Sequence, residues 1–409
     1  MQNKINKRKV FNDPVYGFIT IPYKIIFNLI EHPYFQRLRR ISQLGLSHLV
    51  YPGAHHNRYH HALGACHLMF MALTNLRIKG VDISEDEMKG ALIAILLHDI
   101  GHGPFSHALE HTFVKDAHHE QFSLIIMEKL NEEFKGKLDL AIEIFTGKYN
   151  KEFLHQLVSS QLDVDRLDYL KRDSFYSGVS EGIIGNERII KMLDVKNNQL
   201  VVEEKGIYSI EKFLVARRLM YWQVYLHKTV LVAETLLALV LQRAKELEHE
   251  GVDLFGSPAL KFFLKAKVNM DDFQESGLLD QYLILDDYDV MGAIKVWQNA
   301  DDKVLSDLSI QLVQRRLPKI RIGKTPVEAS DIEEMKDKII EKLSVPEDLI
   351  HYYMFTGKIH NNAYNKNDEP IRILYKDGSI KDIDEASDNL SISSLQKPVE
   401  KYYFIHPRI

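Results

Sequence analysis

The chain has 409 residues, of which 45% are hydrophobic and 27% are charged, and its formal net charge at pH 7 is -5. This length permits one large core or two to three domains. The negative charge gives no general attraction to nucleic acid or to an anionic membrane, so neither is expected as a required partner.

A single cysteine, Cys66, excludes an intramolecular disulfide and fits a reducing compartment. The N-terminal residues lack the apolar core of a signal peptide. The longest apolar stretch, near 229–240, contains Glu234 and is too short to span a bilayer. We therefore expect a cytoplasmic protein.

The first quarter of the chain is expected to form a short hairpin followed by helices. Residues 9–21 alternate loosely around an Asn-Asp-Pro turn signal, which predicts two antiparallel strands. From Pro22 the apolar spacing is helical, and Gly45 marks the expected end of this helix. A long helix is then predicted over 57–76.

The middle of the chain also has a helical pattern. Ser84 and Glu87 form a capping box for a helix that leads to His98. Pro104 suits the first turn of the next helix. Further along the chain we expect three or four helices within 118–172. A strand is expected at 197–205, followed by one long helix over 206–249.

The last third of the chain mixes helices and strands. We expect helices within 280–315 and 330–343, a polar turn-like segment at 359–370, and strands at 318–322, 371–375 and 401–405. The fold class is therefore mainly α, with a small N-terminal β-hairpin and a C-terminal α+β accessory region. We expect a catalytic core over 1–250 and an accessory or oligomerisation region over 251–409.

A dense group of ligand-type residues begins with His98 and Asp99, directly after the apolar run 91–97. Near a helix end, with Gly101 and Gly103 to turn the backbone, the two side chains can reach one point. Imidazole and carboxylate together suit a divalent metal such as Fe, Mn, Zn or Mg. The alternative is an aspartate that caps a helix beside histidines on the surface.

Two other segments carry residues of the same chemical type. Arg58 and His61 are three positions apart and share a helix face. The segment 162–173 places an acidic, an aromatic and a basic side chain on one helix face, at Asp165, Tyr169, Arg172 and Asp173. Such a stripe does not make an apolar core, and the alternative is a solvated face.

Together these segments resemble the HD-domain phosphohydrolases, whose H…HD…D motif matches His61, His98-Asp99 and Asp165. The resemblance is closer still to the HD-domain deoxynucleoside triphosphate (dNTP) triphosphohydrolases. The shared strings span roughly 9–230 in the expected order, and they are QRLRRISQLG, YPGAHHNRYHHALG, LLHDIGHGPFSHALE, HHEQFS, LDVDRLDYLKRD and YLHK. The metal motif alone says little about substrate, whereas the ordered set is specific.

The resemblance implies a helical HD core that binds one divalent metal (Mn, Fe, Mg or Zn) through His61, His98, Asp99 and Asp165. It also implies that a group of histidines contacts the α-phosphate and moves protons at the leaving deoxyribose oxygen, namely His102, His107 and His119. Glu110 matches the carboxylate that pairs with the histidine at the His119 position. The residues leave open which histidine is the acid.

Substrate contacts are likewise carried over from the resemblance. Phosphate contacts are expected from Arg58, Arg166 and Arg217, although the family often has lysine where Arg166 stands. Sugar contacts are expected from the remaining matched residues: Tyr225 against the deoxyribose, Gln43 and Asp173 at the 3′-hydroxyl, and Tyr169 at sugar or phosphate. Tyr221 shares the helix face of Tyr225, where an aromatic residue is as compatible with a core position as with a site.

The resemblance implies hydrolysis of a dNTP to deoxynucleoside and inorganic triphosphate by attack of water on the α-phosphate. The alternatives are an HD phosphohydrolase acting on another nucleotide phosphoester, such as a monophosphate or a signalling nucleotide, and a scaffold with a silent site. Because some relatives are homo-oligomers controlled by nucleotides bound between subunits, a dimer or tetramer and an activating nucleotide are further expectations.

Overall fold

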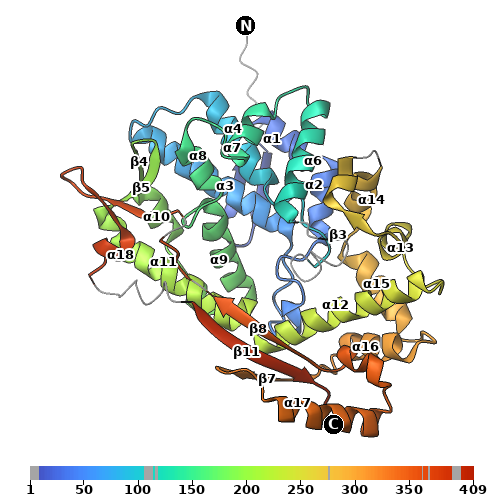
Figure 1. Ribbon diagram of the computed structural model, residues 1–409. Coiled ribbons are helices and arrows are strands. Elements are labelled where there is room, and N and C mark those ends of the chain that lie inside the picture. The colour runs from blue at the N-terminus through green and yellow to red at the C-terminus, as the bar shows by residue number, and fades with distance from the viewer. Residues whose placement is uncertain are drawn as a thin grey trace.

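A computed structural model of the chain describes residues 9–105, 114–115, 118–274, 277–361, 363–366, 369–388 and 398–409. Helices form the body of the molecule, and the strands of the described residues form small sheets of two to four strands (Figure 1). The expected mainly α fold with an N-terminal hairpin and a C-terminal α+β region is confirmed.

The N-terminal hairpin pairs β1 (Lys9–Asp13) with β2 (Gly17–Ile21) in antiparallel register. Asp13 Oδ1 closes the turn, because it accepts hydrogen bonds of 2.9 Å from the backbone amides of Val15 and Tyr16. The hairpin prediction from the alternating pattern is therefore confirmed.

The prediction of a helix from Pro22 to Gly45 is wrong in its second half. Short elements follow one another instead: α1 (Lys24–Ile30), α2 (Pro33–Gln36) and η1 (Arg37–Arg40). The chain leaves the helical conformation at Ile41, Ser42 pairs with Asn57 in a β-bridge, and Gln43 N, at the start of a turn, donates to His56 O at 3.1 Å. These bonds replace the helical ones and turn the 41–45 segment toward the start of the next long helix.

Three long helices form the centre of the core, and α3 packs against the other two. They are α3 (Arg58–Ile78), α4 (Glu85–Leu97) and α9 (Val164–Ser177). The capping box predicted at Ser84 and Glu87 is present at the start of α4. The crossing of α3 and α9 is close, since a Cβ at Gly64 would lie only 2.0 Å from Asp168 Oδ1. The glycine lets the helices approach and places His61 beside the start of α9.

The helix predicted over 206–249 is broken. It consists of α11 (Ile207–Met220), the π-helical turn η6 (Tyr221–Tyr225) and α12 (Lys228–His249). Leu226 N donates to Tyr221 O at 2.7 Å, which closes the wide turn, and the two halves meet at a bend of 55°. No single helix in the described part of the chain is long and apolar enough to cross a membrane, although this bent pair passes by length and composition.

Shorter helices cover the centre. Before the break, α6 (His119–Glu133), α7 (Asp139–Phe145) and α8 (Glu152–Val158) match helices expected within 118–172, and α10 (Asn186–Met192) follows them. After the break they are α13 (Pro258–Lys265), α14 (Leu278–Ile284), α15 (Asp287–Trp297), α16 (Lys303–Val313) and α17 (Ala329–Leu343). The helices expected within 280–315 and 330–343 are therefore present.

The remaining strands join distant parts of the chain. One sheet has the order β10-β9-β5-β4, another the order β7-β11-β8, and β3 pairs with β6. Their bounds are β3 (Val114–Lys115), β4 (Leu193–Lys196), β5 (Gln199–Glu203), β6 (Val268–Asn269), β7 (Lys319–Gly323), β8 (Phe355–Asn361), β9 (Arg372–Leu374), β10 (Ile380–Asp382) and β11 (Val399–His406).

The prediction of a turn-like segment at 359–370 is partly wrong, because its first three residues belong to β8. This polar end of the strand pairs with β11, where His360 lies opposite Glu400 and Asn361 opposite Val399. β8 is an edge strand of this sheet and carries polar residues at its end. Composition alone does not distinguish such a polar strand end from a turn. The division into 1–250 and 251–409 stays a prediction, although β9 pairs with β5 across it.

Candidate active site

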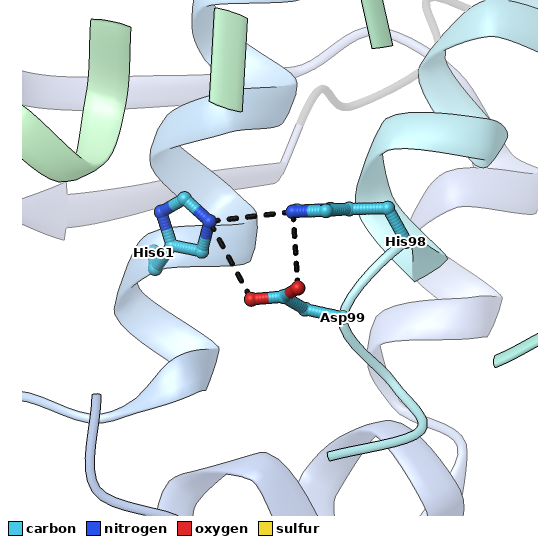
Figure 2. A group of neighbouring side chains, drawn as sticks. All are labelled: His61, His98 and Asp99. Atoms are coloured by element: carbon cyan, nitrogen blue, oxygen red, sulfur yellow. Dashed lines mark hydrogen bonds and ion pairs between the residues drawn. The ribbon is translucent and has the colours of Figure 1, made fainter. Parts of the chain in front are cut away.

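The HD motif residues converge at one point inside the helical core. His61 comes from the second turn of α3, His98 from the end of α4, and Asp99 from the residue after it. Figure 2 shows the three side chains facing one another: the two Nε2 atoms are 3.4 Å apart, and Asp99 oxygens lie 3.6 Å from His61 Nε2 and 3.3 Å from His98 Nε2. All three residues can therefore offer a ligand atom to the same ion.

The hydrogen bonds behind the two imidazoles fix their tautomers. His61 Nδ1 donates to Asp168 Oδ2 at 2.8 Å, and His98 Nδ1 donates to the backbone oxygen of Ile95 at 2.6 Å. Because these partners can only accept, each Nδ1 atom carries a proton, and the Nε2 atoms, which face one another, are the ring nitrogens available to a cation. Two imidazole nitrogens at this separation are suited to a shared cation.

Asp165, at the start of α9, completes the cluster. Its Oδ1 is 2.9 Å from His61 Nε2 and 3.4 Å from His98 Nε2. Donors held about 2.1 Å from one ion at right angles lie about 3.0 Å apart, which agrees with these separations. The four predicted metal ligands therefore fit a divalent cation in both chemistry and spacing.

The charges of this cluster perturb one another strongly. Burial lowers the pKa of His61, but hydrogen bonds to Asp165 and Asp168 outweigh it and raise this pKa to about 10. Burial opposes ionisation of Asp165, yet contacts with His61 and His98 hold its pKa well below the usual range. The protein thus assembles negative charge around the two imidazoles, as a cation site requires.

Two of the predicted catalytic histidines lie next to the metal cluster. The rings of His102 and His119 are stacked, with centroids 3.9 Å apart and planes 15° apart, and His102 Nε2 is 3.3 Å from Asp99 Oδ1. Burial and the neighbouring charge of Arg58 hold the pKa of His102 well below the ordinary value. His102 is therefore a neutral imidazole beside the cluster. His107 and Glu110 lie outside the described residues.

A cavity of about 420 Å³ opens next to the cluster. This volume is within the range of small-molecule sites. Most predicted substrate residues line it together with Asp99, Asp165, His102 and His119, namely Gln43, Arg58, Arg166, Tyr169, Asp173 and Tyr225. The cavity therefore brings together residues that lie far apart in the sequence, from Gln43 to Tyr225.

The predicted phosphate ligands differ in their placement. Arg58 hydrogen-bonds Asp99, so its charge lies beside a metal ligand. Arg166 Nε donates to Ser160 O at 2.5 Å, which orients its guanidinium at the cavity wall. Arg217 is not among the residues that line the cavity, and its Nη1 donates to Ala363 O at 3.2 Å.

Two of the predicted sugar contacts, Tyr225 and Asp173, form a hydrogen-bonded group with His56. Tyr225 donates to Asp173 Oδ2 at 2.8 Å, and His56 Nε2 lies 2.7 Å from Asp173 Oδ1. Burial and the charge of Asp173 raise the pKa of Tyr225 well above its ordinary value, so the phenol stays a donor. Sequence reasoning missed His56, which stacks on Tyr176 with centroids 4.4 Å apart. Its signal was its place in the shared string YPGAHHNRYHHALG.

Some residues that line the cavity were not predicted. They lie on the 43–47 segment, after the HD motif and along the broken helix, and they are Leu44, Gly45, Ser47, Phe105, Leu226 and Glu234. Tyr221, for which the sequence left a core position and a site position equally open, also lines the cavity. Leu44 and Leu226 each follow a predicted sugar residue directly in the sequence, which is the signal that could have identified them.

Comparison with known proteins finds two matching family models and similar proteins. The model of the HD domain matches residues 58–173, and the model of the HD associated region matches residues 184–255. The uncharacterized protein YwfO of Bacillus subtilis is 32% identical, over 98% of this chain and 93% of its own length. A crystal structure of a phosphohydrolase from Bacteroides thetaiotaomicron is 53% identical with a TM-score of 0.95, covering 98% of this chain and all of that one.

A more distant relative has a described activity. Human deoxynucleoside triphosphate triphosphohydrolase SAMHD1 is 28% identical over 70% of this chain, and the match covers 51% of the human protein. This chain therefore spans about half the length of that relative.

Proposed function

Since this chain belongs to the HD-domain family of phosphohydrolases, we propose that it is a metal-dependent dNTP triphosphohydrolase. The observation that carries the proposal is one cavity that joins the metal cluster to cationic side chains and to the Tyr225–Asp173 pair. Similarity to enzymes named dNTP triphosphohydrolases supports the substrate class.

The proposed reaction is attack of water on the α-phosphorus of the dNTP. The bond between this phosphorus and O5′ breaks, and a proton from the water ends on O5′, which gives deoxynucleoside and inorganic triphosphate. A divalent cation held by His61, His98, Asp99 and Asp165 supplies positive charge at the phosphate and lowers the pKa of water toward about 7.

The chain's own residues position the substrate and move the protons. His102 is neutral and buried, so it can accept a proton, and His119 stacks on it at the same wall. Arg58 and Arg166 place cationic groups near the phosphates. The ring of Tyr225 and the carboxylate of Asp173 bound the space for the sugar, where a 2′-hydroxyl would meet the ring.

Anion-exchange chromatography tests the proposal directly. Each dNTP is incubated with purified protein and Mn²⁺ or Mg²⁺, alone and in pairs, because one nucleotide can activate hydrolysis of another. We expect intact triphosphate and deoxynucleoside as products. Release of single phosphate, or no reaction with any dNTP, would redirect the proposal to another nucleotide phosphoester.

The proposal extends to the assembly of the protein and to its location in the cell. We propose a cytoplasmic homo-oligomer, a dimer or tetramer, whose activity responds to a nucleotide bound between subunits. Light scattering with and without dNTPs measures the assembly, and the paired incubations reveal any activating nucleotide.

A further inference from the structure

One cavity residue has no place in the proposed reaction. Glu234 lies on α12 and lines the cavity together with Gly45, Phe105 and Leu226. Its carboxylate reaches the backbone of the 43–47 segment, since a Cβ added at Gly45 would lie 3.1 Å from Glu234 Oε1. The same Cβ would lie 3.7 Å from the carbonyl oxygen of Phe105. Glu234 therefore stands where three separate segments meet.

The carboxyl of Glu234 is half-buried at the cavity wall and has no partner in the described part of the chain. No hydrogen bond or ion pair to it occurs there, and burial raises its pKa to about 8. Other buried or half-buried glutamates of α12 are paired: Glu248 Oε1 accepts from Leu254 N at 3.0 Å, and Glu246 contacts Arg243 at 3.1 Å. A ligand that covers this carboxyl would withdraw it further from water, so a ligand that also supplied a hydrogen-bond donor would bind more favourably than one that did not.

The position of Glu234 relative to the sugar residues indicates which part of a nucleotide it would meet. Two of the predicted metal ligands, Asp99 and Asp165, line the cavity together with Arg58, and Tyr225 and Gln43 are the proposed sugar contacts. Each of these two residues is followed directly by a leucine of the cavity wall, Leu226 or Leu44. A nucleotide with its sugar at Tyr225 would thus extend its base toward these leucines and Glu234.

We propose that Glu234 is a specificity-determining residue whose carboxyl oxygen accepts a hydrogen bond from the exocyclic amino group of the nucleobase. This inference rests on the proposed function, because it concerns the base of a dNTP bound in the same cavity. Adenine, cytosine and guanine carry such an amino group, and thymine does not. The flanking leucines supply apolar contact to any base ring, so the contact with Glu234 distinguishes a base that carries the amino group from the same base without it.

The expected size of the preference follows from the loss of one buried hydrogen bond. Leaving a buried acceptor unpaired reduces kcat/KM by about tenfold, which corresponds to about 1.4 kcal/mol. A site built to pair a polar group discriminates against analogues that lack it, whereas a purely apolar wall discriminates little.

Pairs of substrates that differ only in the amino group test the proposal. The pairs are dATP with purine 2′-deoxyriboside triphosphate, dGTP with 2′-deoxyinosine triphosphate, and dCTP with pyrimidin-2-one 2′-deoxyriboside triphosphate. For the wild type, kcat/KM should fall about tenfold on loss of the amino group in at least one pair. Glu234→Leu should hydrolyse both members of that pair equally well.

The control variant is Glu248→Gln, which changes a buried carboxyl on the same helix away from the cavity lining. It should keep the wild-type ratio in every pair. Glu234→Leu should unfold at or above the wild-type temperature, because it removes a half-buried carboxyl that has no partner in the described part of the chain. This check separates lost recognition from lost folding.

The two levels of the proposal fail in different ways. If the wild type hydrolyses no dNTP under any metal and activator tested, the proposed function fails and this inference falls with it. If dNTPs are hydrolysed but the wild type treats the members of every pair alike, the inference alone is overturned. Retention of the full amino-group preference by Glu234→Leu overturns it as well.

Discussion

Asp168 holds His61 in place through a hydrogen bond of 2.8 Å between Oδ2 and Nδ1. The same carboxylate is held by Arg172, whose Nε and Nη2 donate to it at 2.9 and 3.0 Å. Arg172 Nη1 also donates to Asp13 Oδ2 at 2.8 Å, so the turn of the N-terminal hairpin is linked to the metal cluster. This chain of contacts aims the Nε2 atom of His61 at the other ligands.

Asp168→Asn should weaken binding of a divalent cation roughly 10- to 100-fold, because a neutral amide orients and polarises the imidazole less well than a carboxylate does. Titration with Mn²⁺, followed calorimetrically, measures the change. Asp173→Asn is the matched control, since it alters another buried aspartate of α9 that contacts His56 and Tyr225. Equal cation affinity for wild type and Asp168→Asn would contradict the orienting role.

The double substitution of His98→Ala with Asp99→Ala removes two of the four converging side chains. The protein should then lose bound metal and turnover together, because the remaining donors, His61 and Asp165, hold a cation poorly. His102→Ala is the comparison: it should retain metal while turnover falls at least about 100-fold. Metal content after dialysis and dNTP turnover give both readings. Wild-type turnover by the double variant would show that the metal site lies elsewhere.

Tyr225 is expected to exclude ribonucleotides through its ring and to support Asp173 through its hydroxyl. Tyr225→Ala should raise the kcat/KM for ATP relative to dATP by roughly 10- to 100-fold. Tyr225→Phe keeps the ring, so it should preserve the discrimination while losing the hydrogen bond to Asp173. Unchanged discrimination in Tyr225→Ala would remove this residue from sugar selection.

The His98–Asp99 pair was predictable from the residues because its determinants are local: the two are adjacent at a helix end. Arg58 and His61 lie three positions apart, so periodicity indicates a shared face of α3, but the set of four ligands that includes Asp165 came from the resemblance. The capping box at Ser84 is local in the same sense. Assignment of roles still depended on resemblance to a family.

The missed features depend on distant partners. Arg37 does not continue a regular helix because its buried side chain donates to Leu285 O at 3.0 Å and to His102 O at 2.8 Å. Ser42 N likewise donates to Asp287, 245 positions away. The helix break at 221–227 has no signature in apolar spacing, and Glu234 looked only like an interruption of an apolar stretch. Such features become visible only when the chain is folded.

Glu87 provides a prediction about stability away from the site. It is buried at the start of α4 and accepts hydrogen bonds from Ser84 N at 2.7 Å, Tyr149 at 2.7 Å and Lys151 at 3.0 Å. Burial alone would raise its pKa, but Lys151, Tyr149 and the Ser84 amide outweigh burial and lower the pKa from 4.5 to about 2. The ionised carboxylate therefore stabilises the fold fully above about pH 4.5, and this stabilisation is lost as the pH falls toward about 2.

Glu87→Gln should accordingly reduce the free energy of unfolding by about 2 kcal/mol at pH 7, because it weakens a charged buried hydrogen-bond network. Urea unfolding at pH 7 and at pH 3 measures the difference, which should shrink at the lower pH as the wild-type carboxylate loses its advantage. Asp86→Asn is the control, since this exposed neighbour forms an ion pair with the half-exposed Lys89 and should change stability by less than about 0.5 kcal/mol. A Glu87→Gln effect that is as large at pH 3 as at pH 7 would assign the stabilisation to packing instead of charge.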